Sequence, residues 1–485
     1  MTEPSPGSRR ELGGFDFTLL VIGAIIGADI YVVAGLAAQS LGPAQLVAWA
    51  LAGVLAAFIG LAFVQSAAIC PQVGGSYAYA RRAFGPFIGF IAGWALYLGE
   101  WVALPVFPIA FNSYVSYFLP TASGVGSLLV KVLLVCGVTG VNLLGARKSG
   151  RLNDFLTLAK LVPLALLVVV AAAFIAVHPG AAHAHVRPFA PLGWSGFSTA
   201  LLVIFWAYAG FELAVLPAGE VRTPERTLPR GLLIGMAVAT VFYLLTALSV
   251  VVALPWQDAA ASPRPLADAL GACLAALGLP SHWGPAVMSI GALVSIIGVY
   301  DVFTLGVARL SYALASDGLF PSPFAKLQGK SKTPRVGLVF QGVTSLALAL
   351  VGHLSGFVSS SVFFLGMCYG ITALAALQLV SRNPGQAVRV PGLKPALVVA
   401  AFGGVYLSSQ ASHRILLFGC VAIAGGVLVY AVRERSWRRG AELPEELSRE
   451  EREVVRWATF GEHWLLGFIR RRRGLPTPWL SKPHD

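Results

Sequence analysis

The sequence predicts an all-α polytopic membrane protein with twelve transmembrane helices. Of its 485 residues, 56% are hydrophobic and only 12% are charged, which is about half the charged fraction of ordinary soluble domains. A soluble core cannot bury this much apolar surface, so lipid must be the main solvent. Because hydrocarbon offers no water to hydrogen-bond the backbone, the apolar runs are expected to be helices.

Twelve apolar runs follow one another along the chain, each near or above the roughly 20 residues that a helix needs to cross a bilayer. Their approximate limits are 17–39, 43–68, 84–118, 126–145, 153–177, 195–217, 231–254, 284–315, 335–352, 356–380, 395–411 and 414–432. Hydropathy alone would also fit eleven or thirteen spans. The first run is too long for a secretory signal and no cleavage site follows it, so it is expected to remain in the mature protein.

The basic residues predict how these spans are oriented, because cytoplasmic loops carry an excess of lysine and arginine. Most of the 35 Lys and Arg residues fall near the N-terminus, in alternate loops and in the C-terminal tail. The opposite loops hold only Arg187, Arg264 and Arg414. Both termini are therefore expected to be cytoplasmic, which requires an even number of crossings. The net charge of +13 indicates this bias rather than nucleic-acid binding.

Charged side chains inside the apolar runs are the sharpest functional signal, because a charge at the bilayer centre costs at least about 2.5–3.5 kcal/mol on insertion scales. Lys131 lies near the outer end of its span, where its side chain can reach the headgroups. Glu100 fits a structural and a functional role equally well. Two or more of the remaining charges are expected to pair near mid-membrane; these are Asp29, Lys160, Glu212 and Asp301.

Two segments are typical of helices that are broken in mid-membrane. "GAIIGAD" in the first span contains Gly23 and Gly27, and "FWAYAGFELAVLPAGE" in the sixth span contains Gly210 and Pro217. Glycine lets backbone approach a ligand, and unwound backbone at membrane depth is tolerated only around a cavity. The first and sixth spans are corresponding members of two successive sets of five. This arrangement predicts a 5+5 inverted repeat with a midplane site, plus two extra helices.

The chain is expected to contain one membrane domain between two cytoplasmic ends. In order, the parts are a cytoplasmic N-terminus (1–16), a transporter domain (17–432, with inverted repeats at about 17–177 and 195–380 and spans eleven and twelve at about 395–432) and a cytoplasmic basic tail (433–485). The tail fits either a helix on the inner membrane face or a loosely ordered segment. The five cysteines are scattered without a CxxC pair, so no metal site is expected.

Five motifs, in order, resemble the amino acid–polyamine–organocation (APC) superfamily of permeases over about residues 13–432. They are the glycine pattern of the first span, "PQVGGSYAYARRAFGPFIGFIAGW", "NLLGARKSGRLNDFLTLAKLVPL", "FWAYAGFELAVLPAGEVRTPERTLPRG", and "ARLSYALASDGLFPSPFAKL" followed by "KTPRVG". The resemblance implies a permease with inverted repeats that works by alternating access. The motifs do not determine the substrate.

The resemblance also implies where the substrate binds. Backbone groups of the broken first helix would hold a carboxylate at Gly27, Ala28 and Asp29, with Ile25 lining the pocket. Carbonyls of the broken sixth helix would take the amine. That segment comprises Phe205, Trp206, Ala207, Tyr208 and Gly210, and its tryptophan would close over the substrate. Asp29 stands where the family has a glycine, so an ordinary zwitterionic amino acid is less certain to fit.

Four ionisable residues are expected to take part in coupling or gating. Glu212 matches an acidic position that the family uses for substrate response or proton linkage. Lys160 matches a lysine that stands where sodium sits in sodium-coupled relatives, and Asp301 is its expected partner. Glu100 completes the set. For Asp29 three roles are open: it binds a cationic amine, it pairs with Lys160, or it stays protonated and braces the unwound backbone.

The expected function is a secondary-active permease of the cell membrane for amino acids or related amines, proton-linked and sodium-independent. Its expected partners are a small-molecule substrate, protons and membrane lipid, with no cofactor and no nucleic acid. The alternatives are a polyamine or amine permease or exchanger, a passive channel, and a substrate-sensing homologue that does not transport. The sequence contains no HExxH, GxSxG or GxxxxGK[ST] motif, which argues against an enzyme or an ATP-driven pump.

Overall fold

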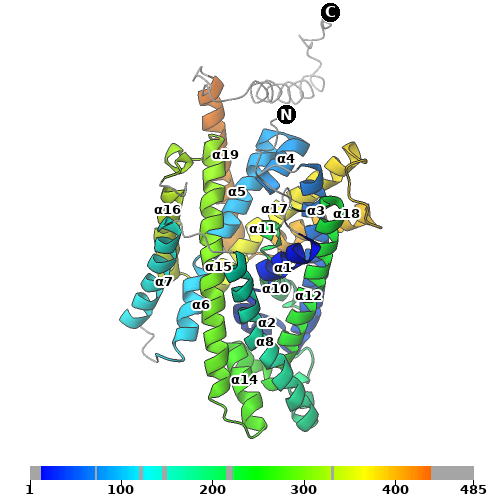
Figure 1. Cartoon of the computed structure of the whole chain (residues 1–485), viewed down its shortest axis with the longest axis vertical. Coiled ribbons are helices and arrows are strands. Elements are labelled where there is room, and N and C mark those ends of the chain that lie inside the picture. Colours follow the sequence, from blue (N-terminus) through cyan, green and yellow to red (C-terminus); the bar gives the residue numbers. More distant parts are fainter. Residues whose placement is uncertain are drawn as a thin grey trace, which may run out of the picture.

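The structure is a computed structural model, and it describes residues 13–70, 74–119, 124–144, 150–214, 221, 223–328 and 333–438. These residues form helices and loops, with one isolated β-bridge between Gln328 and Thr333. The helices (Figure 1) are α1 (Gly14–Ile25), α2 (Asp29–Leu41), α3 (Gln45–Ile69), α4 (Ser76–Phe84), α5 (Pro86–Ala103), α6 (Val106–Val115), α7 (Val125–Leu144), α8 (Gly150–Val177), α9 (Pro179–Val186), α10 (Phe197–Tyr208), α11 (Phe211–Ala214), α12 (Pro224–Ala253), α13 (Trp256–Ala261), α14 (Pro265–Ala276), α15 (Trp283–Ser316), α16 (Arg335–Val351), α17 (Leu354–Arg382), α18 (Leu393–Ser409) and α19 (His413–Arg438).

The helices are those of a multi-pass membrane protein. In the described part of the chain, eight helical stretches are long and apolar enough to cross a membrane. Shorter apolar helices, among them α1, α10, α16 and α18, fall in other runs that the sequence marks as spans. Large apolar side chains also face outward, for example Leu133, Phe402 and Leu417, each more than two-thirds exposed. Such a surface suits hydrocarbon rather than water.

Three of the expected spans are divided into two helices. The first span separates into α1 and α2 at residues 26–28, and the sixth into α10 and α11 at residues 209–210. The third separates into α5 and α6 at Leu104 and Pro105, because proline has no backbone N–H and cannot continue the helical ladder. The first two divisions coincide with the glycine-containing segments of the sequence.

The divided helices lie at the centre of the bundle. Helix α10 packs against α2 and α3, α1 packs against α12, and α17 packs against α3, α4 and α5. The long helix α15 contacts α6, α7 and α8 and extends toward both ends of the molecule, with α4 near one end and α14 near the other (Figure 1). Residues at the breaks of the first and sixth spans are therefore surrounded by protein on all sides.

The ends of the chain lie mostly outside the described residues. The expected N-terminal segment is described only from Gly13, and α1 begins at Gly14. The tail is described to residue 438, where α19 ends. The rest of the basic tail, including any helix on the inner membrane face, lies outside the described residues.

Candidate functional site

The first helix break leaves the N-terminus of a helix inside the core. Helix α1 ends at Ile25, Ile26 is extended, and α2 starts at Asp29. The first N–H groups of α2 have no partner within the helix, and such groups can bind an anion. Gly27 is closely packed, because a Cβ atom at this position would lie 3.0 Å from Val299 of α15 and 3.2 Å from the Asp29 carboxylate.

The second break touches the first. Gly210 adopts a φ of 114°, which side-chain-bearing residues rarely adopt. A Cβ atom on Gly210 would lie 2.4 Å from the carbonyl oxygen of Ala24 in α1. Both carboxylate oxygens of Glu212 lie 3.1 Å from the Gly210 backbone nitrogen. The acidic residue after the break therefore holds the unwound backbone in the place where the two breaks meet.

Tyr243 of α12 joins the two breaks through a single hydroxyl group. Its oxygen lies 2.7 Å from the Ile25 carbonyl oxygen and 3.0 Å from the Ala207 carbonyl oxygen. These carbonyls end α1 and α10, so they lack the usual helical N–H partners. Sequence reasoning missed Tyr243, because nothing in the seventh span sets this tyrosine apart from an ordinary membrane aromatic.

Lys160 of α8 caps the end of α1. The side chain is 8% exposed, and its ammonium donates to the Gly23 carbonyl oxygen at 2.7 Å. A cation beside the C-terminal carbonyls of a helix is favoured by the helix dipole. The Lys160 carbonyl oxygen lies 3.5 Å from the hydroxyl of Tyr31 in α2. Lys160 thus contacts both halves of the broken first helix.

Asp29 is the first residue of α2, and its side chain is 3% exposed. Its Oδ1 atom has no hydrogen-bond partner among the described residues. Lys160 and Glu212 are its charged neighbours. No direct ion pair joins Asp29 and Lys160 in the described part of the chain, where the ion pairs are Arg81–Asp317 and Arg264–Asp268. The carboxyl group is therefore next to the lysine but not bound to it.

Glu100 and Glu212 form a buried carboxyl pair. Glu100 lies on α5, each residue is 3% exposed, and the two carboxyl groups are close enough to interact. A hydrogen bond between two carboxyl groups requires that one of them carry a proton. The Oε1 atom of Glu100 has no partner among the described residues. Tyr369 of α17 adjoins both carboxyl groups.

The structure does not bring Asp301 to Lys160. Asp301 lies on α15, where its Oδ1 atom accepts a hydrogen bond of 2.9 Å from Asn142 of α7. It therefore connects α15 to α7. Val299, two residues earlier, is the residue of α15 that faces Gly27.

The aromatic residues of the sixth span are enclosed by other rings. Trp206 is 2% exposed and lies 6.2 Å, ring to ring, from Phe107. Phe205 lies 6.0 Å from Tyr369. Tyr208 lies 5.2 Å from Tyr243, and its hydroxyl donates to the Trp49 carbonyl. Trp206 thus lies in the core beside the break. Among the described residues, no group of three metal-binding side chains is arranged to hold a metal ion.

Comparison with known proteins gives a match to one family over most of the chain. The profile described as amino acid permease matches residues 12–430. The branched-chain amino acid permease BcaP of Bacillus subtilis is 29% identical over 366 residues, covering 71% of this chain and 75% of that protein. The methylthioribose transporter of the same organism is 27% identical over 450 residues, covering 88% and 94%. The serine/threonine exchanger SteT, also from Bacillus subtilis, is 25% identical and covers 88% and 98%.

A solved structure shares the fold. The manganese transporter of Eremococcus coleocola, crystallised with an aromatic bis-isothiourea compound, superimposes with a TM-score of 0.53 and 14% identity. The match covers 87% of this chain and 94% of the transporter chain. At this identity the likeness concerns the fold alone.

Proposed function

The chain belongs to the amino acid permease family, and from this premise we propose that it is a secondary-active transporter of amino acids that works by alternating access. Family membership makes it a transporter and not an enzyme. The observation that carries the proposal is the contact between the two helix breaks, where Gly210 meets the Ala24 carbonyl. One such place offers both helix-terminal amides and helix-end carbonyls that lack helical partners, the groups that bind a carboxylate and an amine.

The substrate position proposed here lies between the two breaks. The amides at the start of α2 would bind the carboxylate, and the carbonyls of Ile25 and Ala207 would accept the ammonium in place of the Tyr243 hydroxyl. Trp206 would cover the side chain of the substrate. The relatives are named for substrates that range from branched-chain amino acids to methylthioribose, so family membership alone does not identify the substrate.

Sodium independence is proposed because of Lys160. Its ammonium already donates a hydrogen bond to a carbonyl oxygen near the end of α1. Without the lysine, that oxygen could be a ligand of a bound sodium ion. A second cation beside it would be repelled across a short distance in a medium of low dielectric constant. The same lysine bonds to both halves of the first helix, so a change in its charge would alter the position of α1.

Proton linkage is proposed for the carboxyl pair of Glu100 and Glu212. With one shared proton, the pair ties α5 to the segment after the second break. If that proton is lost, two buried anions repel, and Glu212 releases α5 while still holding Gly210. Proton exchange at this pair would therefore be linked to movement of the broken sixth helix.

Uptake into liposomes tests the proposal. Purified protein is reconstituted and supplied with radiolabelled amino acids, first with sodium and then with choline in its place, and with or without an inward proton gradient. We expect accumulation that needs the proton gradient and is unchanged in choline. Glu212→Gln should bind substrate yet lose the pH dependence of uptake, and Trp206→Ala should bind more weakly. Strict sodium dependence, or equilibration without accumulation, would contradict the proposal.

A second candidate function is transport of polyamines or other amines. It is favoured by the free Oδ1 atom of Asp29, which can accept a hydrogen bond from a cationic amine. A substrate carboxylate on the neighbouring amides would instead meet the Asp29 carboxylate, unless a proton or Lys160 neutralises it. Thermal-shift measurements with amino acids and polyamines separate the two functions, because a ligand of the folded state raises its melting temperature.

A further inference from the structure

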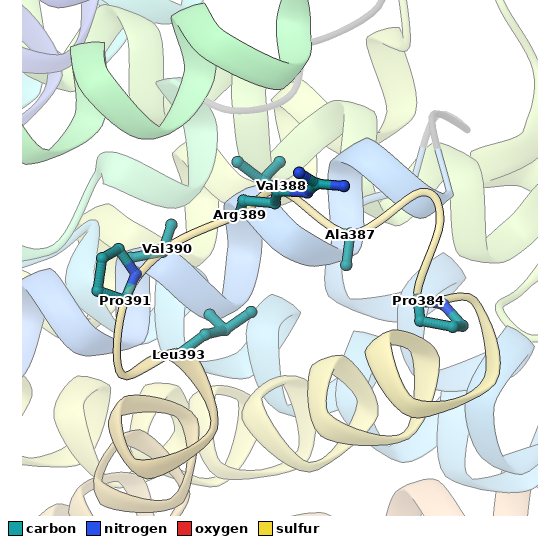
Figure 2. Close-up of a pocket in the computed structure, with 7 residues that line it drawn as sticks. All are labelled: Pro384, Ala387, Val388, Arg389, Val390, Pro391 and Leu393. Carbon is teal, nitrogen blue, oxygen red and sulfur yellow. The ribbon is translucent and has the colours of Figure 1, made fainter.

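The loop between α17 and α18 forms a pocket at one end of the bundle. The pocket has a volume of about 470 Å³ and is lined by Pro384, Ala387, Val388, Arg389, Val390, Pro391 and Leu393. The loop arches over it, with Arg389 near the top of the arch and Pro384 and Leu393 at its feet (Figure 2). Because the loop joins two apolar helices, it lies at the boundary between lipid and water.

A buried side chain fixes the shape of this loop. Gln65 of α3 is fully buried. Its Nε2 donates to the Val388 carbonyl oxygen at 2.9 Å, and its Oε1 accepts from the Val388 backbone nitrogen at 2.9 Å. Val388 is buried and the next residue, Arg389, is exposed. The two bonds therefore present the guanidinium of Arg389 on a prearranged backbone, which lowers the entropy lost when a ligand binds.

The surroundings of the pocket are basic. The segment 382–394 contains Arg382, Arg389 and Lys394 and no acidic residue. Arg382 donates to the Ala83 carbonyl oxygen at 3.4 Å, which places the end of α17 against α4 and its exposed Arg82. This end of the bundle carries the basic loops that the sequence assigns to the cytoplasmic side, where anionic phospholipids give the membrane a negative surface potential.

We propose that this pocket binds the headgroup of an anionic phospholipid. The phosphate lies on Arg389, and the glycerol and first acyl carbons lie against Val390, Pro391 and Leu393. One cation on an apolar wall matches the chemistry of a lipid headgroup region, because the cation can bind the phosphate while the wall contacts the first acyl carbons. The inference does not depend on the identity of the transported substrate.

Binding of phosphatidylglycerol tests the proposal. Full-length protein is placed in nanodiscs of phosphatidylcholine, and its affinity for added dioctanoyl phosphatidylglycerol is measured by thermophoresis. Arg389→Gln should weaken this affinity roughly fivefold, which corresponds to the binding free energy that one basic residue contributes at the membrane surface. Arg389→Lys should lose less, because it keeps the charge but not the two-pronged geometry. Lys326→Gln is the matched control, since it removes one exposed charge outside the pocket.

Melting temperatures provide the second measurement. The wild-type protein should melt at a higher temperature in nanodiscs that contain phosphatidylglycerol than in pure phosphatidylcholine, and Arg389→Gln should lose most of that difference. Equal affinity of wild type and Arg389→Gln would overturn the proposal. So would an equal effect of Lys326→Gln, which would indicate a diffuse surface charge. An equal response to soluble glycerol phosphate would indicate a site for soluble anions instead of lipid.

Discussion

At the scale of single residues, one hydroxyl group joins the two broken helices. Removal of the Tyr243 hydroxyl leaves the buried carbonyls of Ile25 and Ala207 without this donor, which costs about 1–3 kcal/mol. We expect Tyr243→Phe to lower the melting temperature and to change the KM for substrate. The control is Tyr117→Phe, which removes a hydroxyl that donates to the His282 carbonyl oxygen away from the breaks and should leave KM unchanged. Equal KM effects of both variants would contradict a specific role at the breaks.

Asp29 can be assigned a role by two substitutions. If it couples transport through Lys160, Asp29→Asn should still bind an amino acid but no longer accumulate it against a gradient. If it binds a substrate amine, Asp29→Asn should abolish the binding of polyamines or monoamines. Asp29→Gly introduces the glycine that the APC superfamily has at this position. Wild-type affinity and pH dependence in Asp29→Gly would leave only the role of a local brace.

At the scale of elements, the contact between α1 and the second break determines whether the site can form. Gly210→Ala introduces a Cβ atom 2.4 Å from the Ala24 carbonyl oxygen at a φ of 114°. Such backbone strain alone costs roughly 1–3 kcal/mol. We expect a lower melting temperature and loss of uptake. The matched control is Gly306→Ala in α15, where the added Cβ meets nothing within 4 Å and should be tolerated.

The short helix α4 is attached to the end of α15 by a polar cluster. The Tyr77 hydroxyl donates to Asp317, and Arg81 lies 3.2 Å from the same carboxylate. Burial, and then the Asp317 charge, raise the pKa of Tyr77 above its ordinary value of 10.0. The unfolded chain therefore loses this proton at lower pH than the folded protein, so the stabilisation is complete below pH 10.0 and falls as pH rises further. Tyr77→Phe should flatten this alkaline slope in thermal unfolding.

At the scale of the whole molecule, the basic tail distinguishes a transporter from a substrate sensor. The substrate position and the proposed coupling residues lie between α1 and α17, all upstream of residue 439. We expect a chain truncated after residue 438 to retain substrate affinity and uptake in liposomes. A truncated chain that binds substrate and accumulates none would instead assign an essential part of the activity to the tail.

Much of the architecture and several site residues follow from the sequence alone. The apolar runs predict a multi-pass helical protein because lipid leaves no other way to satisfy the backbone. Gly27 and Gly210 indicate the breaks because glycine loosens a helix and lets backbone approach a ligand. Lys160 and Glu212 stand out because a charge within an apolar run is costly. Each of these signals is local, so it can be seen in a short stretch of sequence.

The partners of those residues were decided only by the tertiary structure. The sequence suggests Asp301 as the partner of Lys160, yet the Lys160 ammonium binds the Gly23 carbonyl, while Asp301 faces Asn142. Tyr243 gave no signal, because its hydroxyl acts on carbonyls that are 218 and 36 residues away. Hydropathy measures the cost of placing a side chain in lipid, but it carries no information about which helix faces which. That information comes from packing across the whole bundle.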